Sequence, residues 1–244
     1  MTVKAANLLR RADVVLYAGS LIPETILRRT NPRAELHNSA YLTLEETDSI
    51  VQQGVAQGKL VVRLHSGDTS IYSAIAEQIE RLDKAKIRYE VIPGISAFQA
   101  AAAFLKTEWT LPGRVQTVIL TRAEGRTKMP SREALEKLAV HQATLCLFLS
   151  AKLGDTVQEK LLSAYPPETP VALFYRVTWP DQQVVLTELR SLSKTLKECG
   201  FTRTTLIVVG EAVAGIGGRS KLYDPRHGHL FRPRTGERGN RPGD

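Results

Sequence analysis

Short apolar runs alternate with segments of helical periodicity over the first hundred residues. Val14–Tyr17, Leu60–Leu64 and Tyr89–Ile92 are predicted strands, and between the first two Thr43 and Glu46 have the spacing of a capping box that opens a helix. Parallel strands cannot be joined by a tight turn, so a strand, a crossover helix and a further strand indicate a parallel sheet covered by helices. The first half is therefore predicted to be an α/β unit with a mainly parallel sheet.

The second half is richer in strands. Pro180-Asp181 lies between two of them and predicts a turn, so part of this sheet should be antiparallel. A helix carrying Leu189, Leu192 and Leu196 should end at Gly200, a residue favoured just after helices. The predicted strands are Val115–Leu120, Leu145–Leu149, Val171–Tyr175, Val184–Leu186 and Thr205–Val209.

The fold class that follows is α/β, with two α/β subdomains, the first mainly parallel and the second with a mixed sheet. Leu111-Pro-Gly113 is the predicted linker, which separates a subdomain of residues 1–110 from one of residues 114–222. Residues 223–244 are rich in Pro, Gly and Arg without periodicity, and we expect a disordered basic tail.

Hydropathy, net charge and cysteine spacing limit the kinds of partner that the protein is expected to bind. No window reaches the roughly 20 apolar residues that span a bilayer, and Arg10, Arg11 and Asp13 interrupt any signal-peptide core, so we expect a cytoplasmic protein with no membrane partner. The net charge of +8 suits a polyanionic partner, either nucleic acid or a small molecule with many carboxylates. Cys146 and Cys199 lack the spacing of a metal site, and we expect reduced thiols and no bound metal.

Two turns of similar construction lead from a predicted strand into a helix. In the first, the segment Arg63–Tyr72, Ser66-Gly67-Asp68 follows an apolar strand, at the end where open parallel sheets bind ligands. Gly67 would let backbone approach a ligand closely, whereas Asp68 is equally well explained as a helix N-cap. In the second, Pro93-Gly-Ile-Ser96 precedes a helix faced with alanines, which by itself indicates no more than good packing.

In this order and at this spacing, the two turns resemble the tetrapyrrole (corrin/porphyrin) methylase family. Its members have a strand followed by Gly-Asp-Pro, here with Thr69 in place of Pro, and then a Pro-Gly-Ile/Val-Ser/Thr turn before an Ala-rich helix. The similarity continues along nearly the whole chain. Three segments resemble the branch that methylates C11 of a corrin-ring precursor of cobalamin: Val118–Pro130, Tyr175-Arg-Val-Thr-Trp-Pro180 and Ser220-Lys-Leu-Tyr-Asp-Pro225.

The resemblance implies an S-adenosylmethionine-dependent methyltransferase that releases S-adenosylhomocysteine and acts as a homodimer on a polycarboxylated tetrapyrrole, not on nucleic acid. It places the cofactor in a cleft between the two subdomains and assigns no catalytic general base. Arg122, Arg126 and Arg176 are the candidates for binding the substrate carboxylates, with surface ion pairs as the alternative role. The implied cofactor-binding residues, for each of which core packing is the alternative, are Gly67, Asp68, Ile71, Tyr72, Ser96, Ala97, Leu149 and Tyr175.

The resemblance also implies a strand and a Gly-x-Gly-Pro-Gly-Asp-Pro loop ahead of Thr2-Val-Lys4. We expect an in-frame stretch of roughly 10–20 residues, the length of one strand and loop, upstream of Met1. Three other functions stay open: methylation of a different ring position, methylation of ribosomal RNA by a related branch, and a non-catalytic tetrapyrrole-binding subunit.

Overall fold

The computed structural model describes residues 1–215 together with Ser220 and His227. The basic tail predicted for residues 223–244 therefore lies outside the described residues, apart from His227. Within the described part of the chain, no helix is long and apolar enough to cross a membrane.

The chain divides into two compact units, Met1–Ala100 and the residues that follow. The division falls inside helix α5 (Ala97–Leu105), ahead of the linker predicted at Leu111-Pro-Gly113. The later part of α5 belongs with the second unit because the ring of Phe104 meets that of Phe174 edge-on, with centroids 6.4 Å apart.

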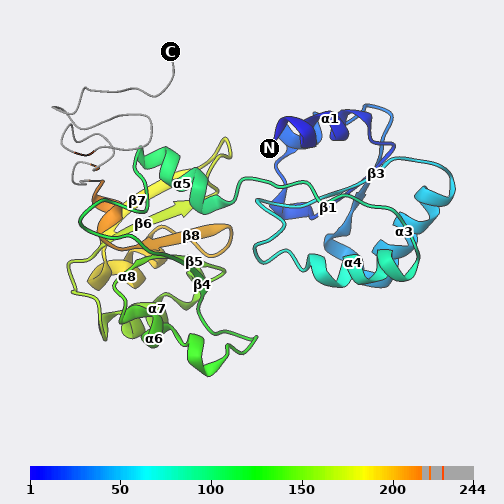
Figure 1. Cartoon of the computed structure of the whole chain (residues 1–244). Helices are drawn as coiled ribbons and strands as arrows, with labels where there is room; N and C mark the ends of the chain where they lie inside the picture. The colour runs from blue at the N-terminus through cyan, green and yellow to red at the C-terminus, as the bar shows by residue number, and fades with distance from the viewer. Residues whose placement is uncertain (216–219, 221–226, 228–244) are drawn as a thin grey trace, which may run out of the picture. The chain divides into compact units, whose positions relative to one another are not determined.

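The first unit contains a three-stranded parallel sheet of order β2-β1-β3. Strands β1 and β3 are labelled in Figure 1. Because all three strands run the same way, their carboxyl ends lie at one edge of the sheet. The predicted strands Val14–Tyr17 and Leu60–Leu64 are confirmed as β1 and, from the next residue, β3. The elements of this unit are α1 (Val3–Arg11), β1 (Val14–Tyr17), η1 (Gly19–Leu21), α2 (Glu24–Leu27), β2 (Glu35–Asn38), η2 (Ser39–Tyr41), α3 (Leu44–Ala56), β3 (Val61–Leu64) and α4 (Ile75–Lys84).

Helices pack on both faces of β1. On one face, Val15 is buried with Leu9 of α1 and with Ala12. On the other face, helix α3 approaches the sheet closely at Gly54, where an added Cβ would lie 2.7 Å from Cγ2 of Val61. A larger residue at this position would force Val61 or the helix to move.

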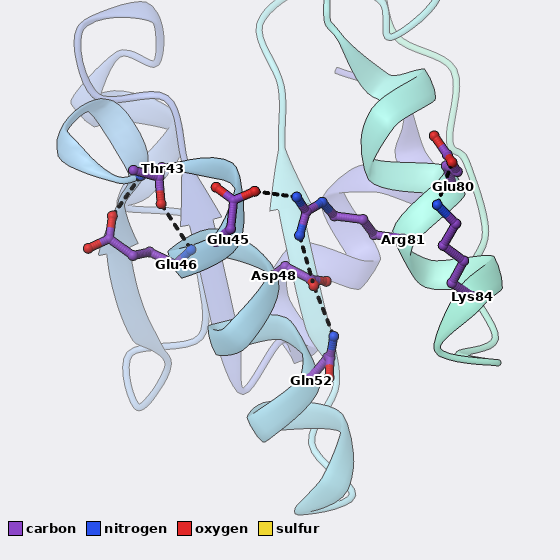
Figure 2. Close-up of polar contacts among 8 residues, drawn as sticks. All are labelled: Thr43, Glu45, Glu46, Asp48, Gln52, Glu80, Arg81 and Lys84. Carbon is purple, nitrogen blue, oxygen red and sulfur yellow. Dashed lines mark hydrogen bonds and ion pairs between the residues drawn. The ribbon is translucent and has the colours of Figure 1, made fainter.

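The predicted capping box opens α3, as Figure 2 shows. The Glu46 carboxylate accepts from the Thr43 amide at 2.7 Å, and the Glu46 amide donates to Thr43 Oγ1 at 3.2 Å. Arg81 of α4 lies between Glu45 and Asp48 of α3 and pairs with both, at 3.6 Å for Asp48. The two helices are thus tied together by a single guanidinium.

One strand prediction for this unit is wrong, and one strand was missed. Tyr89–Ile92 has no regular secondary structure, because the described sheet ends at β3 and no described strand pairs with this segment. A strand exists only through its ladder of hydrogen bonds, so an apolar β-like sequence is not sufficient. Strand β2 was not predicted at all, since an edge strand with polar residues lacks the apolar run that marks buried strands.

Helix α4 begins at Ile75, seven residues after Asp68, the N-cap that the sequence offered. Tyr72 and Ala74 have φ angles of 50° and 51°, in the left-handed region. A right-handed helix does not continue through such residues, so α4 begins only after Ala74. Asp68 is accordingly not the N-cap of α4, a position that Ala74 occupies.

The second unit contains a five-stranded mixed sheet of order β4-β5-β8-β6-β7. All five predicted strands are present, and the turn at Pro180-Asp181 joins the antiparallel pair β6 and β7 as expected. The elements of this unit are β4 (Val118–Arg122), η3 (Ser131–Glu133), α6 (Leu135–Ala139), β5 (Thr144–Phe148), η4 (Ala151–Leu153), α7 (Gly154–Leu162), β6 (Pro170–Tyr175), β7 (Gln183–Glu188), η5 (Leu189–Ser191), α8 (Leu192–Glu198), β8 (Thr205–Val209) and η6 (Glu211–Ala214).

The core of this unit lies between one face of the sheet and helices α6, α7 and α8, which all contribute buried side chains. Leu147 of β5 and Ile207 of β8 are fully buried there. At the margin of the core, the Tyr165 hydroxyl donates to the Ala143 carbonyl at 2.6 Å, and burial raises the pKa of this phenol. The hydrogen bond compensates for burying a polar group.

The two cysteines should differ sharply in reactivity. Cys146 is buried in β5, where burial raises the pKa of its thiol to about 12, whereas Cys199 is exposed. Because the thiolate is the reactive form, we expect iodoacetamide at pH 8 to modify Cys199 alone in the folded protein and both thiols after denaturation. Peptide mass analysis measures this, and rapid native labelling of Cys146 would contradict its placement.

Candidate active site

The first turn of the site follows the carboxyl end of β3. Gly67 has a φ angle of +69°, in the left-handed region that favours glycine. A Cβ added to Gly67 would lie 3.6 Å from the Cα atom of Ser96, so the backbone of this turn touches the second turn directly.

The second turn, Pro93 to Ser96, leads into α5 and depends on a second glycine. A Cβ added to Gly94 would lie 1.9 Å from the carbonyl oxygen of Gly67, well inside van der Waals contact. No side chain fits between the two turns, which therefore meet backbone to backbone. Gly94 was not among the predicted site residues, although the Pro-Gly dipeptide at the end of an apolar run signals such a turn.

Asp68 bridges the two turns. Its Oδ2 atom accepts from the Gly94 amide at 2.7 Å, and its Oδ1 atom accepts from the Ser70 amide at 2.9 Å and from the Ser70 hydroxyl. The Ser70 hydroxyl and, next, the Gly94 amide hold the pKa of Asp68 below its usual value. A carboxylate with these donors is an ionised acceptor at neutral pH.

The other predicted cofactor residues of the first unit lie on or beside the same two turns. The Ile71 amide donates to the Asp68 carbonyl at 3.2 Å, and Tyr72 follows with its left-handed backbone. Ser96 is buried, its amide donates to Oε1 of Gln99 at 2.8 Å, and Ala97 begins α5. The structure thus brings these six predicted residues together at one end of the first sheet: Gly67, Asp68, Ile71, Tyr72, Ser96 and Ala97.

In the second unit, the strand directions place the remaining predicted site residues at one end of the sheet, where three strands finish. Strands β4 and β5 are parallel, and β5 and β6 both run antiparallel to β8, so β4, β5 and β6 end at the same edge. Leu149 follows β5, is 72% exposed and has a φ angle of 55°. Tyr175 ends β6 with its ring stacked on Phe201, the centroids 5.0 Å apart. In open α/β sheets, ligands bind beyond the carboxyl ends of parallel strands, which is where β4 and β5 place Arg122 and Leu149.

Arg122, at the end of β4, forms hydrogen bonds within the loop that follows it. Its Nη1 atom donates to the carbonyl of Thr127 at 3.0 Å and to that of Ala123 at 3.3 Å, and its Nη2 atom donates to the carbonyl of Lys128 at 3.0 Å. These bonds fold the segment after β4 around the guanidinium. Arg126 lies exposed on that segment.

Arg176 follows Tyr175 with a φ angle of 49° and is packed among neighbours. Its guanidinium lies 5.2 Å from the ring centre of Tyr175 and 5.0 Å from that of Trp179, and it pairs with Asp181. Of the three predicted substrate arginines, Arg126 is thus the most exposed, while Arg122 and Arg176 already have protein partners.

Known proteins resemble this chain along most of its length. The model of the family described as Tetrapyrrole (Corrin/Porphyrin) Methylases matches residues 1–193. The chain belongs to this family. Tetrapyrrole methylases are methyltransferases, so the family and the enzyme class predicted from the two turns are confirmed.

Two curated relatives and one solved structure show how far the similarity extends. A cobalt-precorrin-4 C(11)-methyltransferase of Methanocaldococcus jannaschii is 45% identical over 95% of this chain and 90% of its own length. A precorrin-4 C(11)-methyltransferase of Pseudomonas aeruginosa is 43% identical over 96% and 93%. A solved cobalt precorrin-4 methyltransferase has a TM-score of 0.85 at 40% identity, covering 87% of this tetrapyrrole methylase and 90% of that chain.

Proposed function

We propose that this tetrapyrrole methylase transfers the methyl group of S-adenosylmethionine to C11 of precorrin-4 or of its cobalt form. The observation that carries the proposal is identity above 40%, over at least 90% of both chains, to two relatives named for that reaction. The TM-score of 0.85 with a solved enzyme of the same description supports it. The two relatives differ in whether their names include cobalt, and their similar identities favour neither form.

The chemistry asks little of acidic or basic side chains. S-adenosylmethionine supplies a methyl group on a sulfonium, which is an excellent leaving group. The protein has to hold the methyl donor and the ring carbon in line, and such positioning can be worth about 7–11 kcal/mol. The glycine-lined turns at Gly67 and Gly94 suit this task, because rigid backbone groups can contact a ligand without side-chain rearrangement.

A direct assay tests the proposal. The purified protein would be incubated with precorrin-4 and with S-adenosylmethionine carrying a ¹³C-labelled methyl group, and the labelled carbon would be located by NMR. We expect one new methyl group at C11. Label at another ring carbon, or turnover of an earlier tetrapyrrole in preference to precorrin-4, would contradict the assignment.

We propose that the substrate carboxylates are bound by arginines at the carboxyl edge of the second sheet. Arg126 is the candidate for direct contact, because it is exposed on the segment that Arg122 folds. Arg122 and Arg176 belong to the same proposal, with partners that fix their guanidinium planes. An arginine fork matches a carboxylate with two parallel hydrogen bonds.

Changing Arg126 to lysine is expected to raise the KM for the tetrapyrrole about 10-fold, because the charge stays while the paired hydrogen bonds are lost. The affinity for S-adenosylhomocysteine should not change. Arg132→Lys is the matched control, since this nearby arginine is 86% exposed and lies beside Glu133. Steady-state kinetics at saturating methyl donor measure both variants, and equal KM values for Arg126→Lys and wild type would remove Arg126 from the site.

We further propose that the enzyme is a cytoplasmic homodimer. The family resemblance supports the dimer, as does Leu186, an apolar residue that is 61% exposed on the edge strand β7. Light scattering coupled to gel filtration tests the assembly, and the mass of a single chain at micromolar concentration would contradict it.

A further inference from the structure

Asp68 stands in a sequence motif that implies direct contact with the cofactor, but its side chain is already committed to protein donors. A carboxylate offers about four lone-pair sites on two oxygens. Three are taken, by the Gly94 amide on Oδ2 and by the amide and hydroxyl of Ser70 on Oδ1. The carboxylate thus joins two turns that are 26 residues apart in the chain.

The junction is needed because packing alone does not fix the two turns. Gly67 and Gly94 have no side chains to interlock, and their backbones meet with no room for a Cβ atom. The half-buried Gly94 amide gains from having an acceptor here, since an amide that loses part of its water without a new partner destabilises the fold. Asp68 provides that acceptor from the opposite turn.

We propose that Asp68 is a positioning residue: its carboxylate fixes the turn at Gly67 to the turn at Gly94, so that the backbone of both turns forms one preorganised surface for the cofactor. It acts through Gly67 and Ser96, the residues whose backbones meet across the junction. The inference rests on membership of the methyltransferase family and not on which ring carbon is methylated.

Asp68→Asn is the decisive variant, because asparagine has the same shape but only one acceptor oxygen. It can accept at one turn only, and its amide nitrogen then faces a donor at the other turn. We expect the affinity for S-adenosylhomocysteine to fall about 10- to 100-fold, the loss typical of a charged hydrogen bond. At saturating S-adenosylmethionine, kcat should stay within about threefold of wild type, because no reacting atom loses a contact.

Hydrogen exchange gives a readout independent of activity. In the ligand-free protein, Asp68→Asn should speed exchange of the Gly94 amide, whereas Ser70→Ala, which removes only the hydroxyl bond, should leave it close to wild type. Unchanged Gly94 exchange in Asp68→Asn, or a large fall in kcat at saturating cofactor, would overturn the inference in favour of direct contact.

The same experiments separate this inference from the proposed function. If wild type did not bind S-adenosylhomocysteine, the proposed function would fail, while Gly94 exchange would still report whether Asp68 joins the turns. If Asp68→Asn bound the cofactor as wild type does, the inference would fail while the function stood. Should Asp68→Asn fold too poorly for titration, Ser70→Ala remains. It leaves the bond from Gly94 to Asp68 in place, so a cofactor affinity within about threefold of wild type supports the inference, and a loss of about 10-fold or more while Gly94 still exchanges slowly contradicts it.

Discussion

Replacing Gly94 with alanine is expected to lower the affinity for S-adenosylhomocysteine by at least about 100-fold. The new Cβ atom would lie 1.9 Å from the carbonyl oxygen of Gly67, so the two turns must move apart. That movement also breaks the bond from the Gly94 amide to Asp68. Isothermal titration calorimetry on the folded variant measures the effect.

Gly58→Ala provides the matched control in the same unit. Gly58 has a φ angle of +72° but open space where a Cβ would go, so alanine there introduces backbone strain without a clash. The strain should cost about 1 kcal/mol of stability and leave cofactor affinity unchanged. If Gly94→Ala bound the cofactor as tightly as Gly58→Ala, the contact between the turns would not be part of the site.

Replacing Leu147 with alanine is expected to destabilise the second unit by about 2–5 kcal/mol. Leu147 of β5 is fully buried, within the cluster that α6, α7 and α8 cover. The truncation removes apolar contacts and leaves a cavity that the surrounding strands and helices cannot fill. Such a loss is a large fraction of the total stability of an ordinary domain.

Tryptophan fluorescence during urea unfolding reports on this unit alone, because both tryptophans, Trp109 and Trp179, lie in it. Leu162→Ala in α7 is the control, since Leu162 is 36% exposed and its truncation should cost about 1 kcal/mol or less. Equal unfolding midpoints for the two variants would show that Leu147 contributes no more to the stability of this unit than the partly exposed Leu162 does.

Strand prediction succeeded where burial on both faces leaves a mark in the sequence. Val14–Tyr17 and Thr205–Val209 are apolar runs, apart from Thr205, and coincide with β1 and β8. It failed at the polar edge strand β2 and at Tyr89–Ile92, where the sequence is suitable for a strand but no described strand pairs with it. Strand formation depends on a partner that local sequence does not encode.

The candidate site could be predicted only where local sequence marks it. Gly67 and Ser96 could be placed at turns after apolar runs, and the order of the two turns identified the family. The roles of Arg122 and Asp68 could not be read in this way. Arg122 donates to three carbonyls of its own loop. Asp68 accepts hydrogen bonds from both turns. Neither set of partners can be known before the loops have folded.

The sequence by itself determined the α/β class, most of the strands, the two glycine-containing turns and the family, because these follow from apolar periodicity and from motifs of a few consecutive residues. Only the tertiary structure decided that Gly94 is as necessary as Gly67, that α4 begins at Ile75, and that Asp68 joins the two turns. The physical reason is that a hydrogen bond or a backbone contact between residues 26 positions apart exists only once the chain has brought them together.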